Sequence, residues 1–172
     1  MNRKRTRPSD ASSRTLEDEG FRFVTPIVPQ PADFDAQGHL NNAAIGRIFN
    51  DVRIAYIHRY LGERWREFLD AERIVVVARE VHLLYESEGL PSEEYFGGMR
   101  YMRREGRGAI IEQRMIEAAT GRAVARAWVV QLLVRDGRVT DWPDFYFEVV
   151  AEAEGREIEQ RPSVRREWGP GS

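Results

Sequence analysis

The sequence predicts an α+β fold in which one long α-helix packs against an antiparallel β-sheet. Three observations support this class. One amphipathic helical pattern follows the first strand-like segment, residues 73–140 show mainly the alternating pattern of strands, and short turns separate those strands. Strands and helices do not alternate regularly, which argues against a parallel, doubly wound sheet. The helix needs a sheet to cover its apolar stripe, and the sheet needs a covering layer on one face.

Composition narrows the class of protein. The chain has 172 residues, of which 42% are hydrophobic and 31% are charged, as is ordinary for one globular domain with its own core. It has no cysteine, which excludes disulfides and thiol nucleophiles. The formal net charge of −2 argues against a general nucleic-acid binder, and no apolar run suits a membrane span or a secretory signal. We therefore expect a cytoplasmic protein that binds neither nucleic acid nor membrane.

The chain is expected to form one domain with two polar ends. Residues 1–20 are poor in apolar side chains and cannot bury enough surface to offset the entropy of ordering, so we expect a flexible tail. The basic run at residues 3–7 fits contact with RNA or another anionic surface, but a solvated tail is the simpler interpretation. The folded domain is expected at residues 21–155, and residues 156–172 are expected to form a second polar tail.

The first strand and the long helix are expected on either side of a polar segment. Residues 21–28 have a strand pattern, and Pro26 suits an edge strand because proline cannot donate to a central ladder. A helix is expected from Ala43, with Asn41 or Asn42 as the N-cap that accepts an unpaired N–H group of the first turn. Its apolar stripe recurs at three- and four-residue spacing and consists of Ile45, Ile48, Phe49, Val52, Tyr56 and Tyr60.

The remainder of the domain has the pattern of antiparallel strands between two short helices. The helices are expected at residues 63–71, after a stop signal at Gly62, and at residues 145–154. Gly97-Gly98 predicts a bulge within one strand. Glycine-containing turns join successive strands. The expected strands are residues 73–86, 93–104, 109–118, 123–135 and 138–140.

The segment Asp33-Phe-Asp-Ala-Gln-Gly-His-Leu-Asn-Asn42 is the most informative part of the sequence. It places the carboxylates of Asp33 and Asp35, the imidazole of His39 and two amides directly before the long helix. Backbone N–H groups point outward at a helix N-terminus, and the helix dipole favours negative charge there. The segment therefore suits a site that polarises a carbonyl group beside a carboxylate.

Other catalytic signatures are missing from the sequence. There is no G-x-S-x-G nucleophile elbow and no Walker loop. His58 and His82 are isolated, and no spacing of His, Asp and Glu is typical of a metal site, so no metal is expected.

The order of strand, polar motif, long helix and four strands resembles the hotdog fold over roughly residues 21–142. Within it the chain resembles the 4-hydroxybenzoyl-CoA thioesterase-like family of acyl-CoA thioesterases. Two positions depart from the family pattern. Ile45 stands where an aromatic residue is common, and the acidic residue that is common two or three positions before the helix arginine is represented by Asn50-Asp51. These departures concern the identity of the substrate more than the reaction. The matching residues are Asp33, Asp35, Gly38, His39, Asn41, Asn42, Arg53 and Tyr56.

The resemblance implies hydrolysis of an acyl-CoA thioester to the free acid and coenzyme A. Asp35 would act as nucleophile or general base, and backbone N–H groups near Asn42 and Ala43 would polarise the carbonyl. His39 would either act as a general base or, as we favour, support the loop in the catalytic site. Gly38 would supply a positive φ or a close approach to the substrate. No cofactor is implied, because coenzyme A is part of the substrate. The active unit would be a homodimer or homotetramer with the site at the subunit interface.

Several roles stay open at this point. Asn41 is a cap first and a substrate contact second, while Asp33 is expected to form an Asx-turn. Arg53 is expected to anchor the helix through a carboxylate. Arg103 and Arg104 either bind the phosphates of coenzyme A, which suits the guanidinium fork, or belong to a solvated hairpin.

Two alternative functions stay open as well. One is a non-catalytic hotdog protein that binds acyl-CoA or an acyl carrier, and the other is a carrier-protein thioesterase in a biosynthetic pathway. The length and aromaticity of the acyl group are not predicted.

Overall fold

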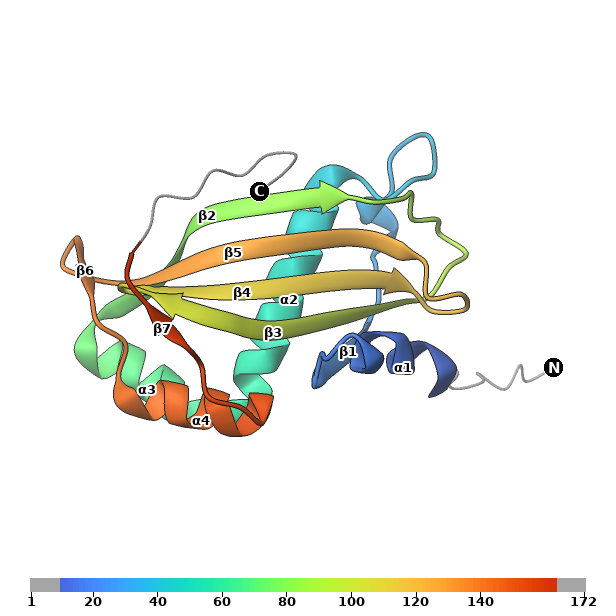
Figure 1. Ribbon diagram of the computed structural model, residues 1–172. Helices are drawn as coiled ribbons and strands as arrows, with labels where there is room; N and C mark the ends of the chain where they lie inside the picture. Colours follow the sequence, from blue (N-terminus) through green and yellow to red (C-terminus); the bar gives the residue numbers. More distant parts are fainter. Residues whose placement is uncertain (1–9, 164–172) are drawn as a thin grey trace. The chain divides into compact units, whose positions relative to one another are not determined.

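The structure is a computed structural model that describes residues 10–163 (Figure 1). The basic run at residues 3–7 lies outside the described residues. Within them, the strands form one seven-stranded sheet whose main order is β1-β3-β4-β5-β2, with β6 paired to β5 and β7 paired to β3. The predicted α+β class is confirmed. The strands are β1 (Phe23–Ile27), β2 (Ile74–Tyr85), β3 (Tyr95–Glu105), β4 (Gly108–Glu117), β5 (Ala123–Arg135), β6 (Arg138–Thr140) and β7 (Gln160–Arg161).

The helices follow the sequence periodicity closely. The long helix α2 comes after a short 3-10 turn, η1, and the predicted short helices appear as α3 and α4. A further helix, α1, precedes the first strand. No helix in residues 10–163 combines the length and the apolar character needed to cross a membrane. The bounds are α1 (Asp10–Asp18), η1 (Pro31–Asp33), α2 (Asn42–Tyr60), α3 (Gly62–Glu72) and α4 (Asp144–Glu154).

The chain divides into two compact units. The first contains the described residues up to Arg53 together with Leu84–Met99 and Gln113–Arg126. The second contains Ile54–Leu83, Arg100–Glu112 and the described residues from Ala127 onward.

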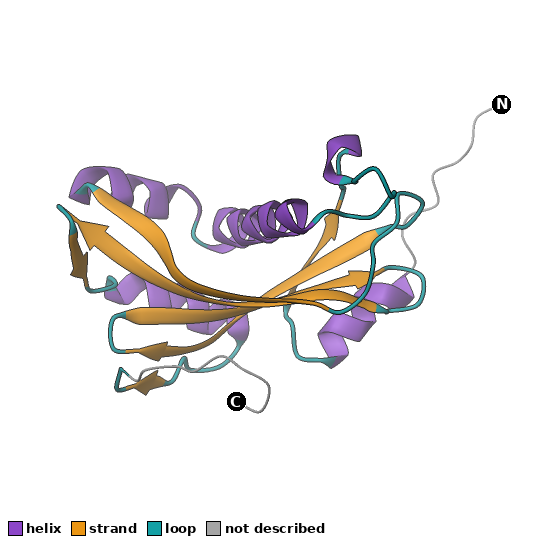
Figure 2. Cartoon of the chain, turned by 90° about the horizontal axis from the view of Figure 1, so that it is seen from above, coloured by secondary structure: helices purple, strands orange, loops and turns teal. Residues whose placement is uncertain are grey.

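The first unit has layers on both faces of β3. Successive residues of a strand point to opposite faces of the sheet, so the neighbours of Gly97 and of Gly98 belong to the layers on opposite faces of β3. A Cβ atom at Gly97 would lie 2.7 Å from Val52 Cγ2 on α2, and one at Gly98 would lie 3.0 Å from Phe21 Cδ1. Helix α2 and the segment at Phe21 therefore cover opposite faces of β3. Figure 2 shows helices on both faces of the sheet.

Gly97 and Gly98 do not form the expected bulge in the pairing with β1, and they allow close packing instead. The antiparallel register pairs Thr25 with Gly97 and Val24 with Gly98 without interruption, so the pairing of β1 and β3 has no bulge at this point. The glycines are needed because the neighbouring layers approach too closely for side chains. Pro26 lies in β1, which ends the main strand order, so the prediction of an edge strand is confirmed.

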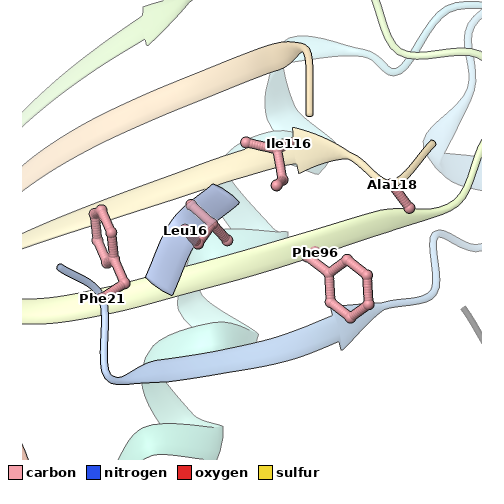
Figure 3. Packing of buried hydrophobic residues seen from close by; sticks show 5 residues of the cluster. All are labelled: Leu16, Phe21, Phe96, Ile116 and Ala118. Carbon is pink, nitrogen blue, oxygen red and sulfur yellow. The ribbon is translucent and has the colours of Figure 1, made fainter. Parts of the chain in front are cut away.

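Helix α1 differs from the flexible tail expected at residues 1–20. Leu16 is fully buried, and it belongs to a hydrophobic cluster formed with distant strands. Its apolar contacts stabilise residues 10–18, which are otherwise polar. Figure 3 shows the cluster, which contains Leu16, Phe21, Phe96, Ile116 and Ala118.

The second unit has an aromatic core between α3 and α4. The rings of Trp65 and Trp142 stack with centroids 6.0 Å apart, and Trp65 also contacts Tyr146 at 4.5 Å. Glu154 is buried at the end of α4, where it accepts hydrogen bonds from Tyr56 Oη at 3.1 Å and from the Tyr101 N–H at 3.0 Å. Burial raises the pKa of the Glu154 carboxyl above its usual value. Tyr56, one of the residues that match the family, is therefore part of this core.

The C-terminal segment also differs from the expected polar tail. The Arg104 N–H donates to the Glu159 carbonyl at 2.8 Å, and β7 pairs in parallel with β3. Ile158 is buried beside this pairing. The pairing with β3 and one buried apolar side chain hold residues 158–161 against the sheet.

Candidate active site

The polar motif folds into a tight turn closed by backbone hydrogen bonds. Phe34 and Leu40 form an isolated antiparallel bridge, and the Asp35 N–H donates to the His39 carbonyl at 2.8 Å. The Gly38 N–H donates to the Asp35 carbonyl at 3.0 Å, and Gly38 has a φ of +82°. The predicted positive φ of Gly38 is confirmed, because glycine closes this turn without a steric penalty.

The Asp35 carboxylate is exposed at this turn and held in one orientation. Its Oδ1 accepts the N–H groups of Gln37 at 2.9 Å and of His39 at 3.0 Å. The hydrogen bond from the His39 N–H holds the pKa of Asp35 below its usual value of 3.8. The carboxylate is therefore ionised at neutral pH. This is the Asx-type geometry that was expected of Asp33.

Asp33 is instead the buried anchor of the motif. Its Oδ2 accepts the Gln30 N–H at 2.6 Å and Arg47 Nη2 at 2.5 Å, while its carbonyl accepts the Asn41 N–H at 2.9 Å. Arg47 was not among the predicted residues, although its place one turn into α2 puts it within reach of the motif. It makes a carboxylate contact of the type expected of Arg53, whose guanidinium donates to Asn50 Oδ1.

The N-terminus of α2 presents polarised N–H groups beside this turn. Asn41 Oδ1 accepts the Ala44 N–H at 2.8 Å, which confirms Asn41 as the cap. Within residues 10–163, the N–H groups of Asn42 and Ala43 have no hydrogen-bond acceptor. The first-turn N–H groups of a helix carry its positive dipole end, so they suit a developing negative charge.

These groups line a pocket of about 480 Å³ in the first unit. The structure brings together the predicted residues Asp35, His39, Asn41 and Asn42, and Gly38 and Ala43 are their neighbours in the chain. Residues 85–88, at the end of β2, form the opposite wall and were not predicted, since no motif marks them. The lining residues are Asp35, His39, Leu40, Asn41, Asn42, Ile45, Tyr85, Glu86, Ser87 and Glu88.

Arg103 and Arg104 do not line this pocket and belong to the second unit. Arg103 Nε pairs with Glu105 Oε1 at 2.6 Å, and the Arg104 guanidinium lies over the Phe147 ring at 4.3 Å from its centroid. Their predicted contact with coenzyme A phosphates stays a prediction. Among the described residues, no group of three or more His, Asp and Glu side chains is arranged to hold a metal ion.

An α+β protein with a fixed carboxylate and a helix N-terminus at one pocket has the parts of an acyl-transfer hydrolase. A family model described as the thioesterase-like superfamily matches residues 29–153, so the chain belongs to this superfamily. The predicted family, the hotdog fold and the enzyme class of thioester hydrolases are confirmed. No match is found among curated proteins.

Solved structures share this fold at low sequence identity. A thioesterase from Thermus thermophilus, complexed with coenzyme A and Zn, is 23% identical with a TM-score of 0.67, covering 80% of this chain and 98% of that one. A DHNA-CoA thioesterase from Staphylococcus aureus is 14% identical with a TM-score of 0.65, covering 79% and 96%. The 12:0-ACP thioesterase from Umbellularia californica is 12% identical with a TM-score of 0.66, covering 76% and 53%.

Proposed function

We propose that the protein hydrolyses acyl-CoA thioesters to the free acid and coenzyme A in the pocket that contains Asp35. One observation carries the proposal: an ionised carboxylate and the two unpaired N–H groups of Asn42 and Ala43 belong to the same small region of the first unit. The thioesterase complexed with coenzyme A supports the choice of thioester.

The pocket supplies what thioester hydrolysis needs. An oxygen nucleophile adds to the carbonyl carbon, and the carbonyl oxygen becomes negatively charged. Donors oriented at that oxygen are worth about 3–4 kcal/mol, which is the role of the N–H groups at the start of α2. The carbon–sulfur bond then breaks and its electron pair leaves on sulfur. A thiol with a pKa of about 8.5 is a good leaving group near neutral pH, so the step needs no strong acid.

Asp35 either attacks the carbonyl carbon itself or removes a proton from the attacking water. Attack by Asp35 gives a mixed anhydride, which water cleaves at the aspartyl carbon so that an Asp35 oxygen leaves with the acid. A single turnover with excess enzyme in H₂¹⁸O separates these routes. Direct attack by water places ¹⁸O in the first acid released, whereas attack by Asp35 places unlabelled oxygen there.

The activity itself is tested with a panel of acyl-CoAs by measuring release of free thiol. Asp35→Asn keeps the shape of the side chain and removes its charge, so we expect kcat to fall by about 10²–10⁴-fold. Absence of turnover on every acyl chain would refute the proposal, and so would an Asp35→Asn variant as active as wild type. Binding of acyl-CoA without turnover would support the non-catalytic alternative.

A carrier-protein thioesterase is the second candidate, because the 12:0-ACP thioesterase has the same fold. The two substrates are compared with one acyl group presented on coenzyme A and on acyl carrier protein. A higher kcat/KM for the acyl group on the carrier protein would show that the acyl carrier protein, and not coenzyme A, carries the preferred substrate.

Arg103 and Arg104 are proposed to bind the nucleotide phosphates of coenzyme A. Replacing both with Ala should raise KM for acyl-CoA and leave unchanged the KM for the same acyl group on a short thiol without a nucleotide. An unchanged KM for acyl-CoA would remove both residues from the site.

A dimer is proposed from the edge strand β2. This strand ends the main sheet order and exposes the apolar side chains of Val75, Val81, Leu84 and Tyr85. An exposed apolar edge strand is a template for pairing with a second copy, which would place that copy next to the residues at 85–88 in the pocket. Sedimentation velocity distinguishes monomer, dimer and tetramer.

A further inference from the structure

The pocket contains a contact between an imidazole and a carboxylate that the chemistry above does not use. His39 Nε2 lies 3.2 Å from Glu88 Oε2, and both residues line the pocket. The two side chains are 39% and 59% exposed. An exposed contact of this kind contributes little to the stability of the fold. We therefore look for its role in the chemistry of the pocket.

Arg122, in the turn between β4 and β5, holds the main chain around Glu88. The Glu88 carbonyl accepts Arg122 Nη1 at 2.6 Å, and the same nitrogen donates to Ser87 Oγ. Arg122 Nη2 also binds Glu93 Oε1 at 2.6 Å, so one guanidinium spans the segment between Ser87 and Glu93. The carboxylate of Glu88 therefore projects from a braced backbone.

The same segment is fixed against the polar motif. The Leu40 N–H donates to the Gly89 carbonyl at 2.9 Å. A Cβ atom at Gly89 would lie 2.6 Å from Leu40 Cδ1, so the segment at Gly89 packs closely against the Leu40 side chain. This contact places Glu88 next to the turn that carries His39.

His39 in turn is connected to Asp35. Its N–H donates to Asp35 Oδ1 at 3.0 Å and its carbonyl accepts the Asp35 N–H at 2.8 Å. The imidazole and the Asp35 carboxylate thus belong to one hydrogen-bonded turn. A group that fixes the ring relative to the wall at 85–88 also limits how this turn moves.

We propose that Glu88 is a positioning residue that fixes the tautomer and orientation of His39. Its carboxylate accepts the Nε2–H, so that in the neutral imidazole Nδ1 is the hydrogen-bond acceptor offered to water or substrate in the pocket. This role rests on the proposed hydrolysis, in which an oriented water molecule attacks the acyl group or its anhydride.

Nitrogen NMR of histidine-labelled protein tests the tautomer without any substrate. The chain has 3 histidines, so a His39→Gln spectrum assigns the signals of His39. At a pH where His39 is neutral, we expect the proton on Nε2 in wild type and a mixture of tautomers in Glu88→Ala. A proton on Nδ1 in wild type, or the same tautomer in both proteins, would overturn the proposal even if the protein had no acyl-CoA activity.

Kinetics test whether Glu88 acts through His39. Glu88→Ala should lower kcat by about tenfold, the smaller end of the loss seen when a residue orienting a functional histidine is removed. Glu88→Gln should retain most of the activity, since its amide oxygen still accepts the Nε2–H. In a His39→Gln background, Glu88→Ala should have no further effect. A loss of the same size in that background would show that Glu88 does not act through His39 and would overturn the proposal.

A matched control is available on α3. Glu63 forms an exposed ion pair with Arg66, and its side chain is 68% exposed. Glu63→Ala removes a carboxylate of similar exposure and should leave kcat unchanged. Equal losses in Glu63→Ala and Glu88→Ala would assign the effect to surface charge and contradict the positioning role.

Discussion

The buried contact between Asp33 and Arg47 leads to a quantitative prediction for the stability of the motif. The Asp33 side chain is 9% exposed, and its Oδ2 accepts hydrogen bonds from the Gln30 N–H and from Arg47. A hydrogen bond to a charged group contributes about 1.5–3 kcal/mol. The Arg47 side chain is 46% exposed and regains water when its partner is removed, which reduces the cost. We therefore expect Asp33→Ala to lower the free energy of unfolding by about 2–3 kcal/mol.

Urea unfolding at a fixed protein concentration measures this loss of stability. An unchanged dependence of the free energy of unfolding on urea concentration shows that wild type and variant unfold in the same reaction. For a chain of this size the expected loss corresponds to a fall in Tm of about 4–12 °C. Asp51→Ala is the matched control, because Asp51 pairs with the same guanidinium at 2.5 Å but its side chain is 56% exposed. That change should cost only about 0.3–0.5 kcal/mol. Equal losses in the two variants would refute the argument from burial.

Three further predictions concern the cap, the close packing and the buried carboxyl group. Asn41→Ala removes the cap of α2 and should lower the free energy of unfolding by about 1 kcal/mol, as measured with urea, while Asn41→Asp should retain most of it. Gly97→Ala places a Cβ atom 2.7 Å from Val52 Cγ2 and should cost about 1–3 kcal/mol in the same assay. Burial raises the pKa of Glu154 above 4.5, so ionising it destabilises the fold as pH rises through the folded-state pKa. Glu154→Gln should therefore be more stable than wild type at pH 8, with the difference disappearing towards pH 4.5, and a constant difference would contradict the assignment.

The parts of the fold that depend on local sequence were predictable. The residues of β5, Ala123–Arg135, match the expected strand, because alternation and the flanking turns define it without reference to other elements. The cap at Asn41 was predictable for the same reason, since it acts on the third residue after it. Helix α1 was not predictable, because Leu16 is a single apolar residue whose partners lie on strands far along the chain.

The candidate site was predictable in its residues but not in their roles. Asp33 and Asp35 are the same residue type two positions apart. The tertiary contacts of Asp33 with Arg47 and with the Gln30 N–H distinguish the buried carboxylate from the exposed one. Glu88 was not found at all. It has no motif, and it reaches the site through the backbone contacts of Arg122 and Gly89, which depend on the tertiary structure.

The exposed edge of β2, through which we propose that two copies pair, has a consequence for the single chain. An apolar strand edge that accepts a second copy also accepts any extended segment, including that of an incompletely folded chain. Val75, Val81 and Leu84 are exposed to solvent in the single chain, where they favour aggregation. Dilution, slow synthesis or a variant that weakens pairing would each lengthen that exposure. In the proposed dimer, the yield of native protein would therefore depend on how quickly two copies meet.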